Sequence, residues 1–239
     1  MADKFEAIRI RYGKVGPGRY ISHLDTIRAA ERAIRRMGLP VLYSEGFSPR
    51  PRMTFAAALQ VGVSSVAEHM DVLLEKGVEP ADVLRMASSA FPETMPLIAA
   101  GRFGGGYALP AKVRRAKYLI RPFCREEAGW SCGSLDDAIR AFEAVPSVTV
   151  PGRDGKEKDV KGLVYAVRAV DGALEVEVAC GDKNLRPQYF IDALSAVTGG
   201  LYSGVYDFCR TGLLIDLGRG PQDPMADCVG TAFSEGFRS

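Results

Sequence analysis

The chain has 239 residues, of which 47% are hydrophobic and 25% are charged, and its formal net charge is only +2 at pH 7. This is the composition of an ordinary globular protein, long enough for one large domain or for two domains of about 100 to 120 residues. No stretch approaches the roughly 18 apolar residues of a membrane span, and the N-terminus lacks the apolar run of a signal peptide. We therefore expect a soluble, cytoplasmic protein that does not associate with membranes.

The first 103 residues predict the order strand, helix, strand, strand, helix, strand. The first helix has apolar residues at helical spacing; Ser22 and Asp25 predict its N-terminal cap, and Gly38 predicts its end. A short strand pair around a loop follows, and a second helix opens on Pro80. The strands are expected at 5–12, 39–44 with 53–63, 68–75 and 96–103, and the helices at 22–37 and 79–91.

The second half repeats this order after a glycine-rich segment, 104–113, which we interpret as a linker. Its strands are expected at 116–123, 148–150 with 160–170, 173–180 and 205–215, and its helices at 134–144 and 187–197. The pattern predicts an α+β fold of two tandem ferredoxin-like (split βαβ) halves with antiparallel sheets, at 1–103 and 114–216. Because residues 217–239 are aperiodic and interrupted by Gly and Pro, we expect a flexible tail there.

The cysteines and histidines limit the chemistry that the chain can carry. The five cysteines are far apart and no pair has the two-residue spacing of a zinc or redox motif, so we expect buried thiols, no metal site and no cofactor. They are Cys124, Cys132, Cys180, Cys209 and Cys228. The only histidines, His23 and His69, exclude a mechanism that needs a histidine cluster.

Positive charge is concentrated near the N-terminus. Residues 1–52 contain 11 Lys and Arg against 5 Asp and Glu, a local charge of +6, so the other 187 residues sum to −4. A basic region placed in this way attracts phosphates and other anions electrostatically. The segment therefore predicts an anionic partner.

Four arginines share one face of the first predicted helix, opposite its apolar stripe. Arg28, Arg32, Arg35 and Arg36 fall at positions i, i+4, i+7 and i+8, and Glu31 is the only acidic residue among them. Arginine binds phosphate through a planar, bidentate fork. Two interpretations remain open: a surface that binds anions, or a solvated outer face.

The loop after this helix, SEGFSPRPR (44–52), is the more specific signal. Its two prolines favour an extended path that presents Arg50 and Arg52, while Ser44 and Ser48 offer hydroxyl groups to phosphate oxygens. Phe47 lies at the tip without apolar neighbours, which suits either a platform on which a base stacks or a plug in the adjoining core. Both roles remain open.

Two acid-base constellations carry less weight. Ser22, His23 and Asp25 diverge within the first turn of a helix, so they favour capping over a hydrolytic triad, and His23 remains a weak catalytic candidate as a lone acid or base. On a strand, Glu68 and Asp71 point to opposite faces. We interpret these two carboxylates as surface charges or as ion-pair partners of the basic loop.

Four motifs together resemble a known bacterial family: RYISHLD (19–25), RAIRRMGLPVLYSEGFSPRPRMTFAAALQVGVSSVAEHMDV (32–72), LRPQ (185–188) and CRTG (209–212). The family is that of uncharacterised radical-SAM-linked proteins, whose domain occurs alone or fused behind a radical-SAM protein. The similarity covers 5–215 and is densest in 19–72. It implies a radical-SAM protein as partner and, from the family's genomic neighbourhood, a connection with RNA.

The chain has no Cys-x-x-x-Cys-x-x-Cys triplet, which an iron–sulfur cluster of a radical-SAM enzyme requires. We therefore expect an accessory protein that binds RNA, such as tRNA or rRNA, for a radical-SAM enzyme and is not catalytic alone. Two alternatives stay open. One is an RNA-processing or RNA-modifying enzyme that uses His23, and the other is an adaptor that docks only the radical-SAM protein.

Overall fold

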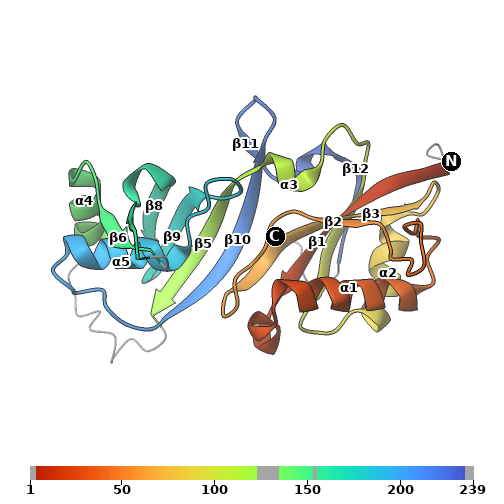
Figure 1. Ribbon diagram of the computed structural model, residues 1–239, viewed down its shortest axis with the longest axis horizontal. Coiled ribbons are helices and arrows are strands. Elements are labelled where there is room, and N and C mark those ends of the chain that lie inside the picture. The colour runs from red at the N-terminus through yellow and green to blue at the C-terminus, as the bar shows by residue number, and fades with distance from the viewer. Residues whose placement is uncertain (1–3, 123–134, 153–154, 235–239) are drawn as a thin grey trace. The chain divides into compact units, whose positions relative to one another are not determined.

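The structure, a computed structural model, describes residues 4–122, 135–152 and 155–234 (Figure 1). It divides into two compact units. Unit 1 comprises 1–113 and 212–239, and unit 2 comprises 114–211. The protein has a mixed α+β fold in which strands predominate. Among the described residues, no helix is both long enough and apolar enough to cross a membrane.

Unit 1 contains the first six predicted elements in the predicted order. Strand β1 pairs antiparallel with β3 and β4, β2 pairs with β3, and β12 adds to the outer edge of β4. The elements are β1 (Phe5–Lys14), η2 (Gly16–Tyr20), α1 (His23–Met37), β2 (Met53–Phe55), β3 (Ser64–Glu75), α2 (Pro80–Ala90), β4 (Leu97–Phe103), α3 (Leu109–Lys112), β11 (Pro221–Gln222), η4 (Pro224–Asp227) and β12 (Cys228–Phe233).

Helix α1 begins and ends as its sequence predicts. The Ser22 hydroxyl oxygen accepts a hydrogen bond from the Asp25 backbone N–H at 3.1 Å and donates to the Asp25 carboxylate at 2.7 Å. Gly38 ends the helix in the left-handed conformation at φ 68°, which glycine adopts without a steric penalty. The capping interpretation of Ser22 and Asp25 is confirmed.

The core of unit 1 lies between its sheet and the two helices, α1 and α2, which cover one face of that sheet (Figure 1). Strand alternation directs Ile8 and Ile10 of β1 into this core, where both are fully buried. Arg9, between them, points to the opposite face of the sheet. The sheet face opposite α1 and α2 is therefore the one that carries Arg9 and its polar partners.

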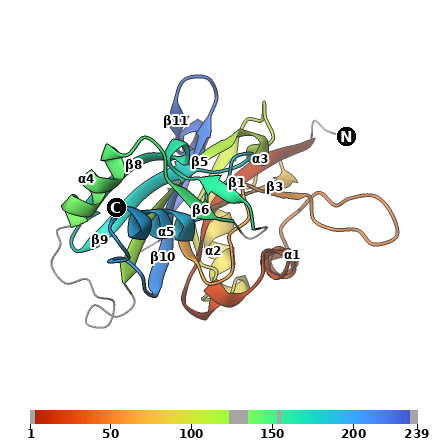
Figure 2. The same ribbon diagram turned by 60° about the vertical axis from the view of Figure 1, so that its left-hand side comes forward.

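Unit 2 contains the strand order β10-β5-β9-β8, with a separate hairpin of β6 and β7. Its helices α4 and α5 pack through the aromatic pair Phe142 and Phe190, whose ring centroids are 5.4 Å apart. The elements are β5 (Val113–Pro122), α4 (Leu135–Ala144), β6 (Thr149–Pro151), β7 (Glu157–Asp159), η3 (Lys161–Leu163), β8 (Val164–Val170), β9 (Ala173–Ala179), α5 (Pro187–Val197) and β10 (Tyr206–Asp216), which continues into unit 1 (Figure 2).

Three sequence predictions differ from the structure. The strands expected at 39–44 and 53–63 reduce to β2 and two isolated bridges, Val41 with Leu74 and Tyr43 with Pro51. The segment 104–113, expected as a linker, contains α3 and the start of β5. Instead of a flexible tail, residues 221–233 form β11, η4 and β12, because the edge of β4 supplies hydrogen-bonding partners that local periodicity does not reveal.

Several predicted features lie outside the described residues. They are Cys124, Cys132, the expected helix start at Ser134, residue 123 of the expected strand and the last five residues of the expected tail. Within the described residues, Cys180, Cys209 and Cys228 form no disulfide. Cys180 is buried as expected, whereas Cys209 and Cys228 are only half-buried, contrary to the expectation of buried thiols.

Candidate functional site: an arginine-lined groove

The predicted basic helix and the predicted loop are held together in unit 1. The Arg35 guanidinium donates a hydrogen bond to the Pro49 backbone carbonyl at 2.9 Å, and the Arg50 guanidinium lies 3.9 Å from the Glu31 carboxylate. The loop 43–52 is therefore attached along α1 by one contact in each direction. We call the exposed set Arg28, Arg32, Arg35, Arg36, Arg50 and Arg52 the arginine-rich surface.

The loop closes on itself as a hairpin-like turn. The Ser44 backbone N–H donates to the Arg50 carbonyl at 2.8 Å, and the Ser44 hydroxyl accepts from the Arg50 N–H at 3.0 Å. Phe47 is at the tip with 110% relative exposure, so the interpretation of this residue as a core plug is wrong. Ser48 is exposed beside it, and Arg52 is exposed as well, with no hydrogen bond or ion pair of its guanidinium to another described residue.

Not every predicted arginine is equally available to a ligand. Arg36 donates to the Ala90 carbonyl at the C-terminus of α2 at 2.5 Å, and Arg28 pairs with Asp25 at 3.2 Å. A carbonyl at a helix C-terminus is an ordinary partner for a cation. Arg36 therefore has a structural role in joining α1 to α2, whereas Arg28, which is more than half exposed, keeps most of its surface in solvent.

A groove of about 590 Å³ lies beside the loop, entirely within unit 1. It lies partly on the sheet face opposite α1 and α2, where Thr54 of β2 stands opposite Asp71 of β3. Its lining combines cations, carboxylates and hydroxyl groups with apolar and aromatic side chains. The lining includes Ala7, Glu31, Ser44, Arg50, Arg52, Met53, Thr54, Asp71, Phe103, Gly105, Tyr107, Ala108 and Leu109.

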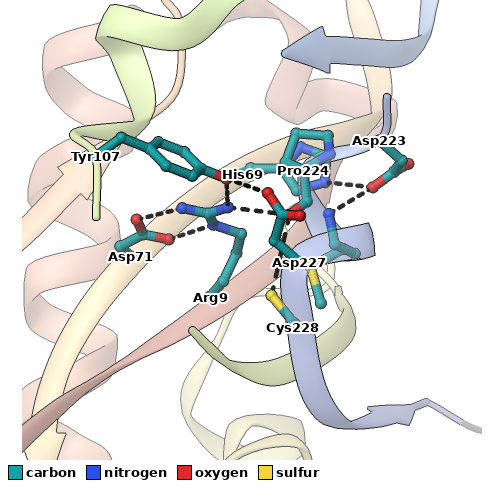
Figure 3. A network of polar contacts seen from close by, with 9 residues as sticks. Arg9, His69, Asp71, Tyr107, Asp223, Pro224, Asp227 and Cys228 are labelled. Carbon is teal, nitrogen blue, oxygen red and sulfur yellow. Dashed lines mark hydrogen bonds and ion pairs between the residues drawn. The ribbon is translucent and has the colours of Figure 1, made fainter. Parts of the chain in front are cut away.

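Behind the groove is a buried polar cluster centred on Arg9, which is fully buried (Figure 3). Its guanidinium donates to both Asp71 carboxylate oxygens, at 2.7 and 2.9 Å, and to the Tyr107 hydroxyl at 2.8 Å and the Pro224 carbonyl at 3.0 Å. The Tyr107 hydroxyl in turn donates to the Asp227 carboxylate at 3.0 Å. These five residues form what we call the Arg9 network.

The Arg9 guanidinium also lies over the Phe103 ring, 3.8 Å from its centroid, a cation–π contact. Burial alone would lower the pKa of Arg9, but the hydrogen bonds and charge of Asp71, with help from Tyr107, outweigh it and raise that pKa. For Tyr107, which is neutral when protonated, burial has the opposite effect and raises the pKa. The network therefore contains a buried charged pair, Arg9 and Asp71, in which every guanidinium nitrogen of Arg9 donates a hydrogen bond.

The C-terminal segment approaches β4 closely because Gly101 has no side chain. A Cβ at that position would lie 2.7 Å from both Cys228 Cβ and Thr231 Oγ1, so any larger residue would push β12 away. Cys228 consequently lies near the network, and burial raises the pKa of its thiol to about 11.

His23 does not join the groove. Its ring makes an edge-on contact with Phe55 at a centroid distance of 5.9 Å, and it begins α1, whereas Arg50 contacts Glu31 eight residues later. Eight residues of helix span about 12 Å along its axis. The structure therefore does not bring the weak catalytic candidate together with the loop arginines.

The Arg9 network was missed by sequence reasoning. Asp71 was interpreted as a surface charge or a partner of the loop, and Tyr107 lay in the expected linker, yet both contact Arg9. The signals were an arginine between two isoleucines of β1 and an acid between two apolar residues of β3, which stand directly opposite each other. Among the described residues, no group of three or more His, Cys, Asp and Glu side chains could hold a metal ion.

The comparisons with known proteins concern the family more than the activity. A model of the family described as "Uncharacterized protein conserved in bacteria (DUF2344)" matches residues 7–187. No curated protein matches the chain.

Two solved structures show a distant likeness. A chain in the "Crystal Structure of a Cbf5-Nop10-Gar1 Complex" is 15% identical, with a TM-score of 0.41, over 86% of this chain and 48% of that one. This chain thus spans about half the length of that relative. The "Crystal Structure of an Unknown Protein from Galdieria sulphuraria" is 12% identical, with a TM-score of 0.25, over 86% of this chain and 96% of that one. No functional conclusion follows from TM-scores this low.

Proposed function

The chain belongs to this family of uncharacterised bacterial proteins, and we propose that it is an accessory protein that binds RNA through its arginine-rich surface. The observation that carries the proposal is the attachment of the loop to α1, which gathers arginines from two segments on one side of unit 1. Arginines in such a group hold phosphates in a sequence-independent way.

The exposure of Phe47 supports the same proposal. An aromatic side chain with no protein packing at a loop tip costs solubility, and next to Arg50 and Arg52 it has the arrangement of a stacking platform between phosphate contacts. Every base has a flat face, so such stacking tolerates any sequence. Single-stranded RNA, whose bases are accessible, is the form that this surface suits best.

The resemblance to radical-SAM-linked proteins leads us to propose a radical-SAM protein as the partner that receives the RNA. We also propose that each unit is a split βαβ unit of the ferredoxin-like type. The strand orders β4-β1-β3-β2 and β10-β5-β9-β8 support this. In each set of four strands, one helix follows the first strand in the chain and a second helix follows the third, as in a split βαβ unit. The fold by itself assigns no activity.

An RNA-cleaving function is not favoured by the geometry, because His23 lies at the start of α1 and outside the groove lining. A protein-only adaptor would use the same arginines against an acidic surface. Co-purification of the radical-SAM protein that survives nuclease treatment, without any RNA retention, would support the adaptor instead.

The proposal is tested by the salt dependence of RNA binding. We expect the affinity for a single-stranded RNA to fall steeply with salt, and the variant Arg28→Gln/Arg32→Gln/Arg50→Gln/Arg52→Gln to lose roughly 0.7 units of log–log slope for each phosphate contact removed. Arg35 and Arg36 are left intact because both donate to backbone carbonyls. Arg85→Gln, an exposed arginine of α2, is the matched control. Absence of salt-sensitive RNA binding would overturn the proposal.

A further inference from the structure

The groove beside the arginine-rich surface has features that phosphate binding does not explain. Two carboxylates, Glu31 and Asp71, line the same groove as Arg50 and Arg52. Asp71 is explained by its two hydrogen bonds from Arg9, but Glu31 places a negative charge 3.9 Å from Arg50, and a carboxylate repels phosphate. Glu31 is therefore the feature of the lining that suits a ligand with hydrogen-bond donors as well as a phosphate.

Both carboxylates keep acceptor capacity. The Glu31 oxygen lies 3.9 Å from Arg50, which is an ion-pair distance and longer than a hydrogen bond. Each Asp71 oxygen accepts one hydrogen bond from Arg9, and a carboxylate oxygen has room for a second. The groove therefore presents fixed, acceptor-only groups next to cations.

The aromatic part of the groove lining, Tyr107 and Phe103, is held in place before any ligand arrives. The Tyr107 hydroxyl accepts from Arg9 and donates to Asp227, so the ring that lines the groove has one orientation (Figure 3). The ring also packs edge-on against Phe103 at 4.8 Å between centroids. A flat ring fixed in this way is preorganised for contact with a base, because little rotamer entropy remains to be lost.

The size of the groove suits a single nucleotide. Its volume of about 590 Å³ falls within the range of roughly 300–1,000 Å³ that is typical of small-ligand sites. A groove of this volume is too small for a duplex. Met53 and Leu109 add apolar surface, while Arg50, Arg52 and Ser44 provide phosphate contacts. Cations, a fixed aromatic ring and acceptors thus occur together at the scale of one nucleotide.

We propose that this groove binds one unpaired guanine nucleotide, with Glu31 accepting from the guanine base edge and with Arg50 and Arg52 holding its phosphate. Guanine is the base that offers two adjacent donors, N1–H and the N2 amino group, to a carboxylate. Cytosine and adenine offer one amino group, and uracil offers no amino group. The inference rests on the proposed function in that RNA supplies the nucleotide.

The test compares fluorescein-labelled uridine octamers with and without one central guanosine, measured by anisotropy at fixed salt. We expect the guanosine octamer to bind roughly tenfold more tightly, since a bidentate pair discriminates by about that factor or more. Glu31→Gln and Thr54→Trp should each reduce the difference to within about twofold. Thr54 is exposed and opposite Asp71, so a tryptophan there fills the groove without replacing an arginine.

Thr149→Trp is the matched control, because it introduces the same residue at an exposed strand position outside the groove lining, and it should leave the preference unchanged. Equal binding of the two octamers by the unmodified protein would overturn the groove assignment while leaving the proposed function intact. A guanosine preference that persists in both Glu31→Gln and Thr54→Trp would overturn it as well.

A competition arm separates the source of the nucleotide. Displacement of the guanosine octamer by GMP but not by AMP or UMP supports the assignment, and equal displacement by all three contradicts it. If GMP binds and neither octamer does, the proposed RNA-binding function fails, and the groove remains a guanine-nucleotide site for a free ligand.

Discussion

Two groups of arginines in unit 1 face carboxylates, and their surroundings give them opposite roles. Arg9 is fully buried, with four hydrogen bonds to Asp71, Tyr107 and Pro224. Arg50 is 66% exposed and lies 3.9 Å from Glu31. A buried pair must be fully hydrogen-bonded because it has lost its water, whereas an exposed pair contributes little and can exchange partners. Arginine content alone therefore does not locate a binding surface.

Replacing Arg9 should have the largest effect on the stability of the protein. Arg9→Met removes one partner of a buried pair, leaves Asp71 without its hydrogen bonds, and should lower the free energy of unfolding by about 3–5 kcal/mol. The measurement is urea denaturation followed by circular dichroism. Arg32→Met is the control, since a surface substitution on α1 should change stability by no more than about 0.5 kcal/mol. Equal stability of the two variants would contradict a structural role for the Arg9 network.

Replacing Phe47 should affect RNA binding and leave stability unchanged. Phe47→Ala should weaken single-stranded RNA binding by about 1–3 kcal/mol, the usual contribution of a base stacked on an aromatic ring. It should leave the melting temperature unchanged, because the side chain is fully exposed. Phe103→Ala should instead lower the melting temperature, because it removes a buried ring that packs under Arg9. A melting temperature lowered by Phe47→Ala would count against the stacking role.

The smallest expected effect is a loss of stability at high pH. The pKa of Cys228 rises from an ordinary value near 9 to about 11 in the folded protein, and the pKa of Tyr107 also rises, so the folded state holds these protons more tightly than the unfolded state. Stability should therefore be fully present below pH 9 and decline as the pH rises toward 11. Thermal melts between pH 8 and 11 measure this decline. Cys228→Ala should make the decline shallower, and an unchanged slope would exclude Cys228 as a contributor.

The predictions that held are those that depend on neighbours in the chain. Helix α1 follows from apolar spacing, the Ser22 cap and the Gly38 end, all of which act within a few residues. The segment 39–63 was less predictable, because its alternation is compatible with strands, but only Met53–Phe55 forms a strand beside β3, while Val41 makes an isolated bridge to Leu74. Strand formation requires a partner that local sequence does not specify.

The candidate site divides in the same way. The arginine-rich surface could be located from the sequence because its arginines lie within 25 residues of one another, on one helix and the loop that follows it. The Arg9 network could not, since Arg9 meets Asp71 62 residues away, Tyr107 98 residues away and Pro224 215 residues away. Only sheet register and the return of the C-terminal segment bring them together.

Local residue order was enough to predict the mixed α+β class, the capped helix α1, the positive charge of residues 1–52 and the arginines of the loop 44–52. It also excludes the cysteine triplet of a radical-SAM enzyme. The tertiary structure decided that Phe47 is exposed, that residues 221–233 complete unit 1, and that a groove with both cations and carboxylates lies beside the loop. The reason is physical: charge and periodicity are local properties, whereas burial, pairing and pKa depend on which distant segments displace water from one another.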